Sequence, residues 1–240
     1  VMLSYFGGKL RLSQRGVYPA PEHDVVVDAF AGGAGYPLAH RHSRVILIDR
    51  NPIVCAVWQY LIGASESEII GLPNLEPGQM IDDVVGISQE ARWLIGFHVA
   101  QGVTHPRKQA SKRVRDKPDS YWCIRTRQRI ASQLSVIRRW TVHEGSYMDA
   151  DSLVSGPATW FVDPPYHASG HHYRFNAGRG DDATQWYAEL ADWCRSRAGL
   201  TIVCEQIGAE WLPFEQVAEF SRGGNRGPQS AKEVAWIQRQ

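Results

Sequence analysis

The sequence predicts an α/β fold with a mostly parallel sheet, interrupted by one inserted subdomain. Strand-like runs lie near residues 25–28, 45–48, 159–163, 200–204 and 233–237, and helical patterns alternate with several of them, as in parallel βα units. The alternation stops between about Ser65 and Asp119, where proline and glycine are frequent and one helical pattern runs from Ser88 to Gln101. We therefore expect a sheet domain made of residues 1–63 and 120–240 and an inserted subdomain over residues 64–119.

Chain length and cysteine usage restrict the class of protein. At 240 residues the chain can bury one good core, or a core with a small added subdomain. The sequence contains no run of about 18 apolar residues, so no membrane span is expected, and its first residues do not resemble a signal peptide. Its four cysteines are scattered without a Cys-x-x-Cys pair, which predicts buried free thiols in a reducing compartment and no zinc site. These features favour a cytoplasmic protein.

The first strand leads into a glycine-rich turn with the sequence DAFAGGAG, from Asp28 to Gly35. Three valines precede the turn, and Pro37 suits the first turn of a following helix. Glycines let the backbone pass close to a ligand at the carboxyl edge of a parallel sheet, although the full Gly-x-Gly-x-x-Gly fingerprint is absent. The turn favours a nucleoside cofactor, and a tight turn that binds nothing is the alternative.

The second strand-like run ends at Asp49. An acidic residue at the strand tip after a glycine-rich turn suits hydrogen bonds to the hydroxyls of a ribose. Alternatively, this residue belongs to a helix start, with Asn51 as the cap and Pro52 in the first turn. The two interpretations are compatible.

A basic segment follows in the middle of the chain. Residues 107–139 contain 11 Lys and Arg against two acidic residues, so their charge is 11 − 2 = +9, and the rest of the chain, at a total of +1, carries 1 − 9 = −8. This contrast predicts a phosphate-binding face, with a solvated arginine-rich helix as the alternative. A helix after Asp119 would bury Ile130, Leu134 and Ile137 on one stripe. The candidate phosphate contacts are Arg107, Lys108, Lys112, Arg113, Arg115, Arg125 and Arg127.

The most informative motif is Asp163-Pro164-Pro165-Tyr166, which follows the apolar run of residues 158–162. It places a carboxylate, a rigid turn and an aromatic ring at one strand tip, which suits holding a flat base by its exocyclic amine. The alternative is an ordinary strand exit with a capping Asp and a packed Tyr. The next stretch, residues 167–183, predicts a mobile loop that closes over such a base, and the glycine-rich residues 222–227 are a second candidate for phosphate contacts.

The order of these motifs resembles that of the Dam-type DNA adenine-N6 methyltransferases, over nearly the whole chain. The shared motifs are YFGGK from Tyr5 to Lys9, DAFAGG from Asp28 to Gly33, DRN from Asp49 to Asn51, and DPPY from Asp163 to Tyr166. The segment GSYMD, from Gly145 to Asp149, is similar to the Ser-Tyr-x-Asp segment that the family carries before its catalytic motif. The chain departs from the family pattern at two places. It has Ser4 where the family often has Lys, and Asp28-Ala29 where the family often has Glu-Pro. Neither change removes a group that the chemistry needs.

The resemblance implies a Rossmann-like sheet that binds S-adenosylmethionine and releases S-adenosylhomocysteine, with residues 64–119 recognising the target DNA. It implies cofactor contacts by Tyr5, Lys9, Asp28, Phe30, Gly32, Gly33, Asp49, Tyr147, Met148 and Asp163. In this scheme Tyr5 and Lys9 lie at the methionine end, Asp49 holds the ribose, and Tyr147 and Met148 flank the adenine ring.

The implied reaction is methylation of the N6 amine of a flipped adenine in double-stranded DNA, by a monomer or weak dimer. The amine is a poor nucleophile, because its lone pair is delocalised into the ring. We assign one hydrogen-bond acceptor for it to the carboxylate of Asp163 and the other to the carbonyl of Pro164, whose direction the pair with Pro165 fixes, while Tyr166 stacks on the base. Direct in-line transfer requires no metal and no covalent intermediate.

Other functions remain open at this stage. A cytosine-N4 DNA methyltransferase handles a similar amine, whereas RNA or protein-glutamine methyltransferases would more often show Asn in place of Asp163. From another class, a catalytically inactive nucleic-acid-binding protein could have the same fold. The short insert suggests loose sequence specificity, because few side chains could reach base edges.

Overall fold

The computed structural model describes residues 1–116, 121–167, 183–222 and 229–240. Its strands are β1 (Val26–Asp28), β2 (Val45–Asp49), β3 (Thr141–Glu144), β4 (Ala158–Val162), β5 (Gly199–Gln206), β6 (Glu215–Arg222) and β7 (Gln229–Arg239). Its helices are α1 (Leu10–Gln14), α2 (Gly35–Ala39), α3 (Pro52–Gly63), α4 (Glu66–Gly71), α5 (Gln89–His98), α6 (Arg113–Asp116), α7 (Ile124–Ala131), α8 (Leu134–Ile137), the 3₁₀ helix η2 (Tyr147–Asp149), α9 (Ala150–Leu153) and α10 (Ala183–Arg195).

The described strands form one seven-stranded sheet in the order β3-β2-β1-β4-β5-β7-β6. The first five of these are mutually parallel, and β7 runs antiparallel to both of its neighbours. From β1 the chain first winds toward β3 and then crosses to β4 on the other side, so the strand order reverses between β1 and β4. This is the doubly wound, Rossmann-like arrangement, in which ligands bind outside the carboxyl ends of the strands at the reversal. The predicted α/β fold is confirmed.

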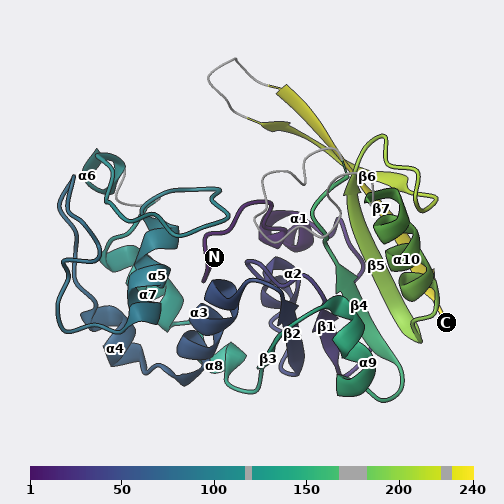
Figure 1. Cartoon of the computed structure of the whole chain (residues 1–240), viewed down its shortest axis with the longest axis horizontal. Helices are drawn as coiled ribbons and strands as arrows, with labels where there is room; N and C mark the ends of the chain where they lie inside the picture. The colour runs from purple at the N-terminus through teal and green to yellow at the C-terminus, as the bar shows by residue number, and fades with distance from the viewer. Residues whose placement is uncertain (117–120, 168–182, 223–228) are drawn as a thin grey trace.

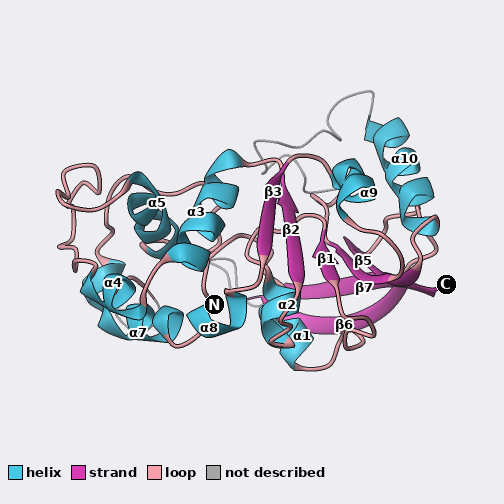
Figure 2. Ribbon diagram, turned by 90° about the horizontal axis from the view of Figure 1, so that it is seen from below, coloured by secondary structure: helices cyan, strands magenta, loops and turns pink. Residues whose placement is uncertain are grey.

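Both faces of the sheet are covered, because successive side chains of a strand point to opposite faces. On β1, Val26 belongs to one buried cluster and Val27 to the other, and on β4 Phe161 and Trp160 divide in the same way. The first cluster includes residues of α2 and α3, and the second includes residues of α10. Figure 2 shows α9 and α10 lying apart from α1, α2 and α3 across the strands. The apolar runs that identified these strands are the consequence of this double burial.

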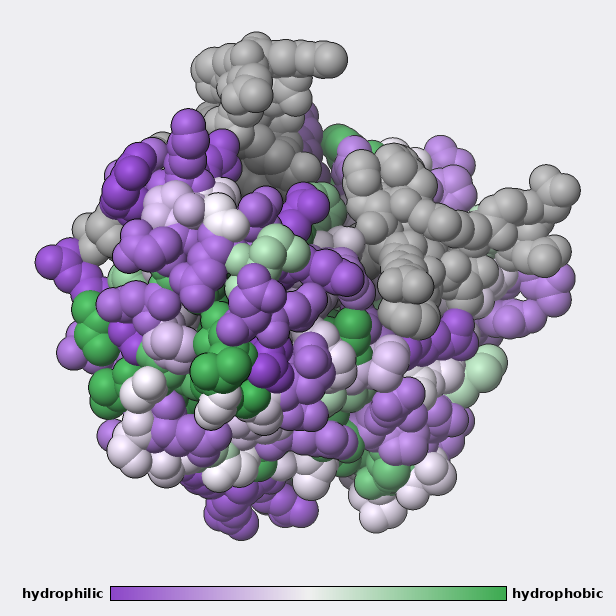
Figure 3. All heavy atoms as spheres, turned by 60° about the vertical axis from the view of Figure 1, so that its left-hand side comes forward, coloured by the Kyte–Doolittle hydropathy of each residue, from purple (hydrophilic) through white to green (hydrophobic). Residues whose placement is uncertain are grey.

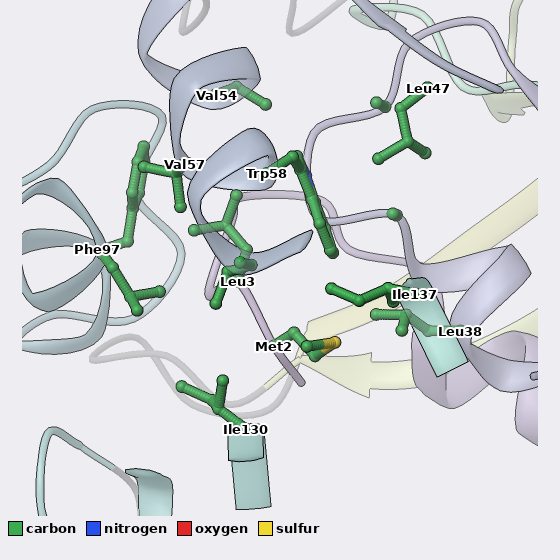
Figure 4. Close-up of a cluster of buried hydrophobic side chains, with 14 of the residues drawn as sticks. Met2, Leu3, Leu38, Leu47, Val54, Val57, Trp58, Phe97, Ile130 and Ile137 are labelled. Carbon is green, nitrogen blue, oxygen red and sulfur yellow. The ribbon is translucent and has the colours of Figure 1, made fainter. Parts of the chain in front are cut away.

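Helices α4 to α7 form a lobe beside the sheet (Figure 1). The lobe shares the buried cluster of one sheet face, since Phe97 of α5 and Ile130 of α7 belong to the same cluster as Trp58 of α3. Figure 4 shows that Met2 and Leu3 of the N-terminal segment lie within this cluster. The core is therefore continuous from the sheet into the lobe, and the division into residues 1–63 and 120–240 and an insert of residues 64–119 stays a prediction.

Side-chain caps account for where several helices begin. Asn51 accepts a hydrogen bond from the backbone N–H of Ile53 at the start of α3, as the sequence predicted. Ser65 and Ser88 cap α4 and α5 in the same way. These oxygens satisfy backbone N–H groups that a helix start otherwise leaves unpaired.

The structure differs from the expectation in two elements of the sheet and in one helix. Strands β3 and β6 were not predicted: β3 has only four residues, none of them fully buried, so its sequence lacks an apolar run. The predicted helix with the stripe Ile130, Leu134 and Ile137 is divided into α7 and α8 by a break at Ser132 and Gln133. All three stripe residues are nevertheless fully buried.

The surface on the side of the lobe is mostly hydrophilic, with apolar side chains scattered between polar ones (Figure 3). Among the described residues, no helix combines the length and the apolar character that crossing a bilayer requires. The four cysteines are free, and three of them are buried.

Candidate active site

The predicted motifs meet at one cavity outside the carboxyl ends of β1, β2 and β4, where the strand order reverses. The empty space within the cavity, counted together with the solvent at its open mouth, is about 870 Å³. Its lining includes these predicted site residues: Tyr5, Lys9, Asp28, Phe30, Gly32, Gly33, Asp49, Tyr147, Asp163 and Pro165. Segments more than 150 residues apart in sequence, from Tyr5 to Pro165, therefore form one site.

The glycine-rich turn packs tightly against the N-terminal segment. A Cβ on Gly35 would lie 2.4 Å from the backbone nitrogen of Leu10, and one on Gly32 would lie 2.9 Å from the ring of Tyr5. Gly32 also has a φ of 42°, in the left-handed region that favours glycine. At these positions the glycines allow the Tyr5–Lys9 segment to pack directly on the turn. The sequence predicted a different role for them, the close approach of a ligand.

Asp49 lies at the tip of β2, and its carboxylate is held by backbone groups. Its two oxygens accept hydrogen bonds of 2.8 Å from the N–H groups of Gly32 and Asn51. Burial raises the pKa of Asp49, and these two N–H groups oppose the rise. The carboxylate thus couples the glycine-rich turn to the start of α3 and faces the cavity, where the predicted ribose contact would be made.

Asp28, at the tip of β1, is a buried carboxylate that has no counter-ion in contact among the described residues. The residue is 2% exposed, and its Oδ1 makes no hydrogen bond within the described part of the chain. Burial raises the pKa of Asp28 well above its usual range, and the nearby Asp163 and Asp49 raise it further. A buried, unpaired polar atom in a cavity wall is costly in the free protein and is typical of a binding site.

Asp163, directly after β4, forms an ion pair with Lys9. The Nζ of Lys9 donates to both carboxylate oxygens, at 2.7 and 2.8 Å, and to the carbonyl of Gly7 at 3.0 Å. Burial raises the pKa of Asp163 to about 6, although Lys9 opposes the rise. Burial alone would lower the pKa of Lys9, but Asp163 and Glu233 together raise it above its usual value. At neutral pH the site therefore contains an ionised carboxylate and an ammonium group.

Tyr166 does not lie where base stacking would require it. Its ring is 9% exposed and lies 4.8 Å from the Nζ of Lys9, and its hydroxyl donates to the Oε1 of Glu233 at 2.7 Å. The predicted stacking position is contradicted for this conformation, because the ring is packed in the core beneath Lys9. Pro164 is also buried and is absent from the cavity lining, whereas Pro165 contributes to it.

Two further side chains hold the Asp163–Tyr166 turn in place. The hydroxyl of Tyr187, on α10, donates to the carbonyl of Pro165 at 2.6 Å. Glu205, at the end of β5, is fully buried and accepts from the N–H of His167 at 3.1 Å. Sequence analysis missed these residues and Glu233. The signal available for the two glutamates was their position, directly after the strand-like run of residues 200–204 and at the start of the run of residues 233–237, where a buried charge needs partners.

Aromatic rings line the side of the cavity toward α10. The rings of Phe30 and Tyr147 lie 5.7 Å apart, and the ring of Trp186 packs edge-on against both, at 6.2 and 6.1 Å. Trp186 was not predicted, because its helix carries no motif that points to the cavity. Met148 was predicted to flank the cofactor, but it is 49% exposed and lies outside the lining, so this assignment is corrected. η2 turns the side chain of Met148 to solvent while that of Tyr147 is buried.

The predicted phosphate contacts divide into two groups. Arg107, Lys108, Lys112, Arg113, Arg115 and Arg125 are exposed on the lobe. Arg127 is only 6% exposed, donates to the carbonyl of Ile70 and the Oδ1 of Asn74, and lies 6.0 Å from the ring of Trp122. The prediction for Arg127 is corrected: its guanidinium joins α7 to the segment after α4 instead of facing solvent.

Some predicted features lie outside the described residues. They are Asp119 as a helix cap, most of the loop of residues 167–183, and most of the glycine-rich segment of residues 222–227. Within the described residues, no group of three or more His, Cys, Asp or Glu side chains could hold a metal ion.

Comparisons with known proteins give only remote likenesses. No protein-family model and no curated protein matches the chain. Three similar solved structures are a "conserved hypothetical protein" of Streptococcus pyogenes, a "putative methyltransferase" of Escherichia coli and a "putative rRNA-methylase" of Clostridium thermocellum. Their identities are 13%, 12% and 12%, with TM-scores of 0.35, 0.37 and 0.41. The matches cover 90%, 96% and 97% of this chain and 87%, 82% and 98% of the other chains. With TM-scores this low, the likenesses carry no argument about fold or function.

Proposed function

We propose that this chain is an S-adenosylmethionine-dependent methyltransferase that acts on the exocyclic N6 amine of adenine in DNA, as a Dam-like enzyme. The observation that carries the proposal is the meeting of Asp163, Asp28 and the glycine-rich turn at one cavity, at the reversal point of the sheet. These are the motif residues that the resemblance assigns to the methyl acceptor and to the methyl donor.

The residues of the cavity fit the proposed cofactor. S-adenosylmethionine carries a methyl group on a positively charged sulfur and supplies it to a nucleophile. Three carboxylates, Asp28, Asp49 and Asp163, line the cavity. Oδ1 of Asp28, which has no hydrogen-bond partner among the described residues, suits a cationic ligand. Phe30, Tyr147 and Trp186 would enclose a flat ring, and Asp49 would accept from ribose hydroxyls.

The chemistry of the chain's own residues is positioning and electrostatics. The carboxylate of Asp163 accepts a hydrogen bond from the amine of the base and then takes the proton that the amine loses on methylation. A pKa of about 6 suits a group that is ionised at neutral pH and can still accept a proton. Tyr187 and Glu205 hold the carbonyl of Pro165 and the N–H of His167, which limits movement of the turn that would carry the proposed acceptors.

Exposed basic side chains on the lobe support a polyanionic substrate. Arg107, Lys108, Lys112, Arg113 and Arg115 lie within ten residues of one another on the lobe, and all five are exposed. Such groups bind phosphates through charge and counterion release, without reading sequence. They therefore support a nucleic acid as the substrate, and the preference for adenine in DNA rests on the DPPY motif.

The test is methylation of unmethylated duplex DNA with labelled S-adenosylmethionine, followed by digestion to nucleosides. We expect N6-methyladenine, and we expect Asp163→Ala to abolish it while the variant still binds the cofactor. N4-methylcytosine would overturn the choice of base. Cofactor binding without any methylated nucleoside from DNA would overturn the proposed substrate and favour the inactive DNA-binding alternative or an RNA substrate.

The pH dependence of the rate is a second test of the role of Asp163. The carboxylate must be ionised to accept a hydrogen bond, so activity is present above its pKa and is lost as the pH falls through about 6. Below that value we expect the rate to fall about tenfold per pH unit. A rate that stays constant down to about pH 4.5 would exclude this role for Asp163.

A further inference from the structure

Lys9 lies between two carboxylates, the partly buried Asp163 and the fully buried Glu233, and the proposed reaction uses only Asp163. Its Nζ is 2.7 Å from Asp163 and 3.7 Å from the Oε1 of Glu233, and the Lys9 and Glu233 side chains are 6% and 3% exposed. Glu233 is on β7, opposite Gln206 of β5, and belongs to none of the recognised motifs. Its Oε1 also accepts from Tyr18 at 2.8 Å and from Tyr166 at 2.7 Å.

The ion pair in this conformation conflicts with the role proposed for Asp163. Both oxygens of Asp163 accept from the ammonium group, which weakens them as acceptors for an amine and as a site for its proton. If Lys9 simply left, a buried ammonium would remain without a carboxylate, at a cost of several kcal/mol or the loss of its proton. A second carboxylate within reach removes this difficulty.

We infer that Glu233 is a positioning residue, which takes over the ammonium group of Lys9 when the amine of the substrate occupies Asp163. The required movement is small: shortening the distance of 3.7 Å to a hydrogen bond of about 2.8 Å shifts Nζ by roughly 0.9 Å. Lys9 remains charged throughout, and Asp163 becomes an ionised carboxylate with free lone pairs in a buried site. The inference rests on the proposed function, because it needs a substrate amine at Asp163.

The surroundings of Lys9 favour such a transfer. The titratable groups near it are Asp163 after β4, Glu233 on β7, Cys204 on β5, Asp28 on β1, and the hydroxyls of Tyr18 and Tyr166. Tyr18 and Tyr166 keep Glu233 in place by donating to it, and the ring of Tyr166 lies beneath the ammonium at 4.8 Å. A cation that moves from Asp163 toward Glu233 therefore stays next to an aromatic face.

The first experiment separates the charge of Glu233 from its hydrogen bonds. In Glu233→Gln the amide oxygen still accepts from Tyr18 and Tyr166, but the negative charge is lost. We expect the single-turnover methylation rate to fall about 10- to 100-fold. The dissociation constant of the cofactor should change by less than about twofold, and the midpoint of urea unfolding should shift by no more than a few tenths molar. The matched control is Glu22→Gln, which should keep the wild-type rate. Glu22 is an exposed carboxylate that pairs with Arg239, a residue of β7 like Glu233.

The second experiment needs no activity and observes Lys9 directly, by NMR of its labelled side chain during a pH titration. In Asp163→Asn we expect Lys9 to stay charged at neutral pH, because Glu233 remains as its partner. In the double variant Asp163→Asn, Glu233→Gln we expect the pKa of Lys9 to fall by about 3 units or more relative to the single variant, since burial then acts on Lys9 without either of the two carboxylates next to it.

The outcomes distinguish this inference from the proposed function. A wild-type rate in Glu233→Gln would overturn the role of Glu233 while the proposed methyltransferase remains. Equal pKa values of Lys9 in Asp163→Asn and in the double variant would overturn it as well, whatever the activity. An inactive wild-type protein that binds neither cofactor nor DNA would instead overturn the proposed function.

Discussion

Replacing Asp28 by Asn should stabilise the free protein at neutral and alkaline pH and weaken cofactor binding. The carboxylate is 2% exposed and its Oδ1 is unpaired within the described residues, so its charge opposes folding. Asn has nearly the same shape and can keep the hydrogen bond that the carboxylate accepts from the N–H of Phe30. Removing an unpaired buried charge should raise the free energy of unfolding by about 1–3 kcal/mol.

The stabilising effect of Asp28→Asn should depend on pH, because Asp28 binds its proton with different affinity in the folded and unfolded states. The folded-state pKa of Asp28 is raised above 3.8, so the folded protein binds the proton more tightly than the unfolded chain does. This contribution to stability is full below 3.8 and is lost as the pH rises through the folded-state pKa, by up to about 1.4 kcal/mol per pH unit. The variant lacks this loss, so the difference between the free energies of unfolding of the two proteins should be smallest at low pH and should grow as the pH rises toward the folded-state pKa.

Urea unfolding of the free protein at several pH values measures this difference, and calorimetry measures the cofactor affinity. The control is Asp24→Asn, a change at an exposed carboxylate, which should alter neither quantity. If Asp28→Asn destabilises the protein, or stabilises it equally at all pH values, the argument from an unpaired buried charge is wrong. Unchanged cofactor affinity would remove Asp28 from the proposed site.

Three further substitutions, two of them with a control variant, test the site and the scaffold. Trp186→Ala should raise the cofactor dissociation constant about tenfold by loss of a ring contact, whereas Met148→Ala, outside the cavity, should not; calorimetry checks both. Arg127→Ala should lower the free energy of unfolding by about 3 kcal/mol, and Arg115→Ala should leave it unchanged but reduce the salt dependence of DNA binding by about one ion. Gly35→Ala places a Cβ 2.4 Å from the backbone nitrogen that begins α1 and should cost at least about 3 kcal/mol in urea unfolding, so near-wild-type stability would contradict the tight packing of this turn.

The meeting of the motifs at one cavity could be predicted from the sequence because of a property of parallel sheets. Strands β1, β2 and β4 are parallel, so their carboxyl ends share one edge. Residues at the ends of these strands or directly after them, such as Asp49 and Asp163, must therefore lie near one another. Apolar runs identified the strands, because both faces of the sheet are buried.

The burial of Arg127, which was predicted to contact phosphate, could have been predicted from its position in the sequence. Arg127 precedes Ile130 by three positions and Leu134 by seven, so the spacing puts it on the buried stripe of the helix. The structure buries it there, with Ile70 and Asn74 as its partners. Basic charge alone indicated a phosphate contact, whereas helical periodicity indicated the interior, and periodicity was the better guide.

The chain's local patterns were enough to establish the α/β class, the strand tips and the acidic and glycine residues that surround the cavity. They could not reveal that Lys9 pairs with Asp163, that Glu233 approaches both Lys9 and Tyr166, or that Tyr187 holds the carbonyl of Pro165. Strand and helix patterns depend on periods of two and 3.6 residues, which are visible in sequence. The contact of Tyr166 with Glu233, 67 residues away, depends on the packing of β7 against the parallel strands, and the contact of Tyr187 with Pro165 depends on the packing of α10; no local pattern encodes either.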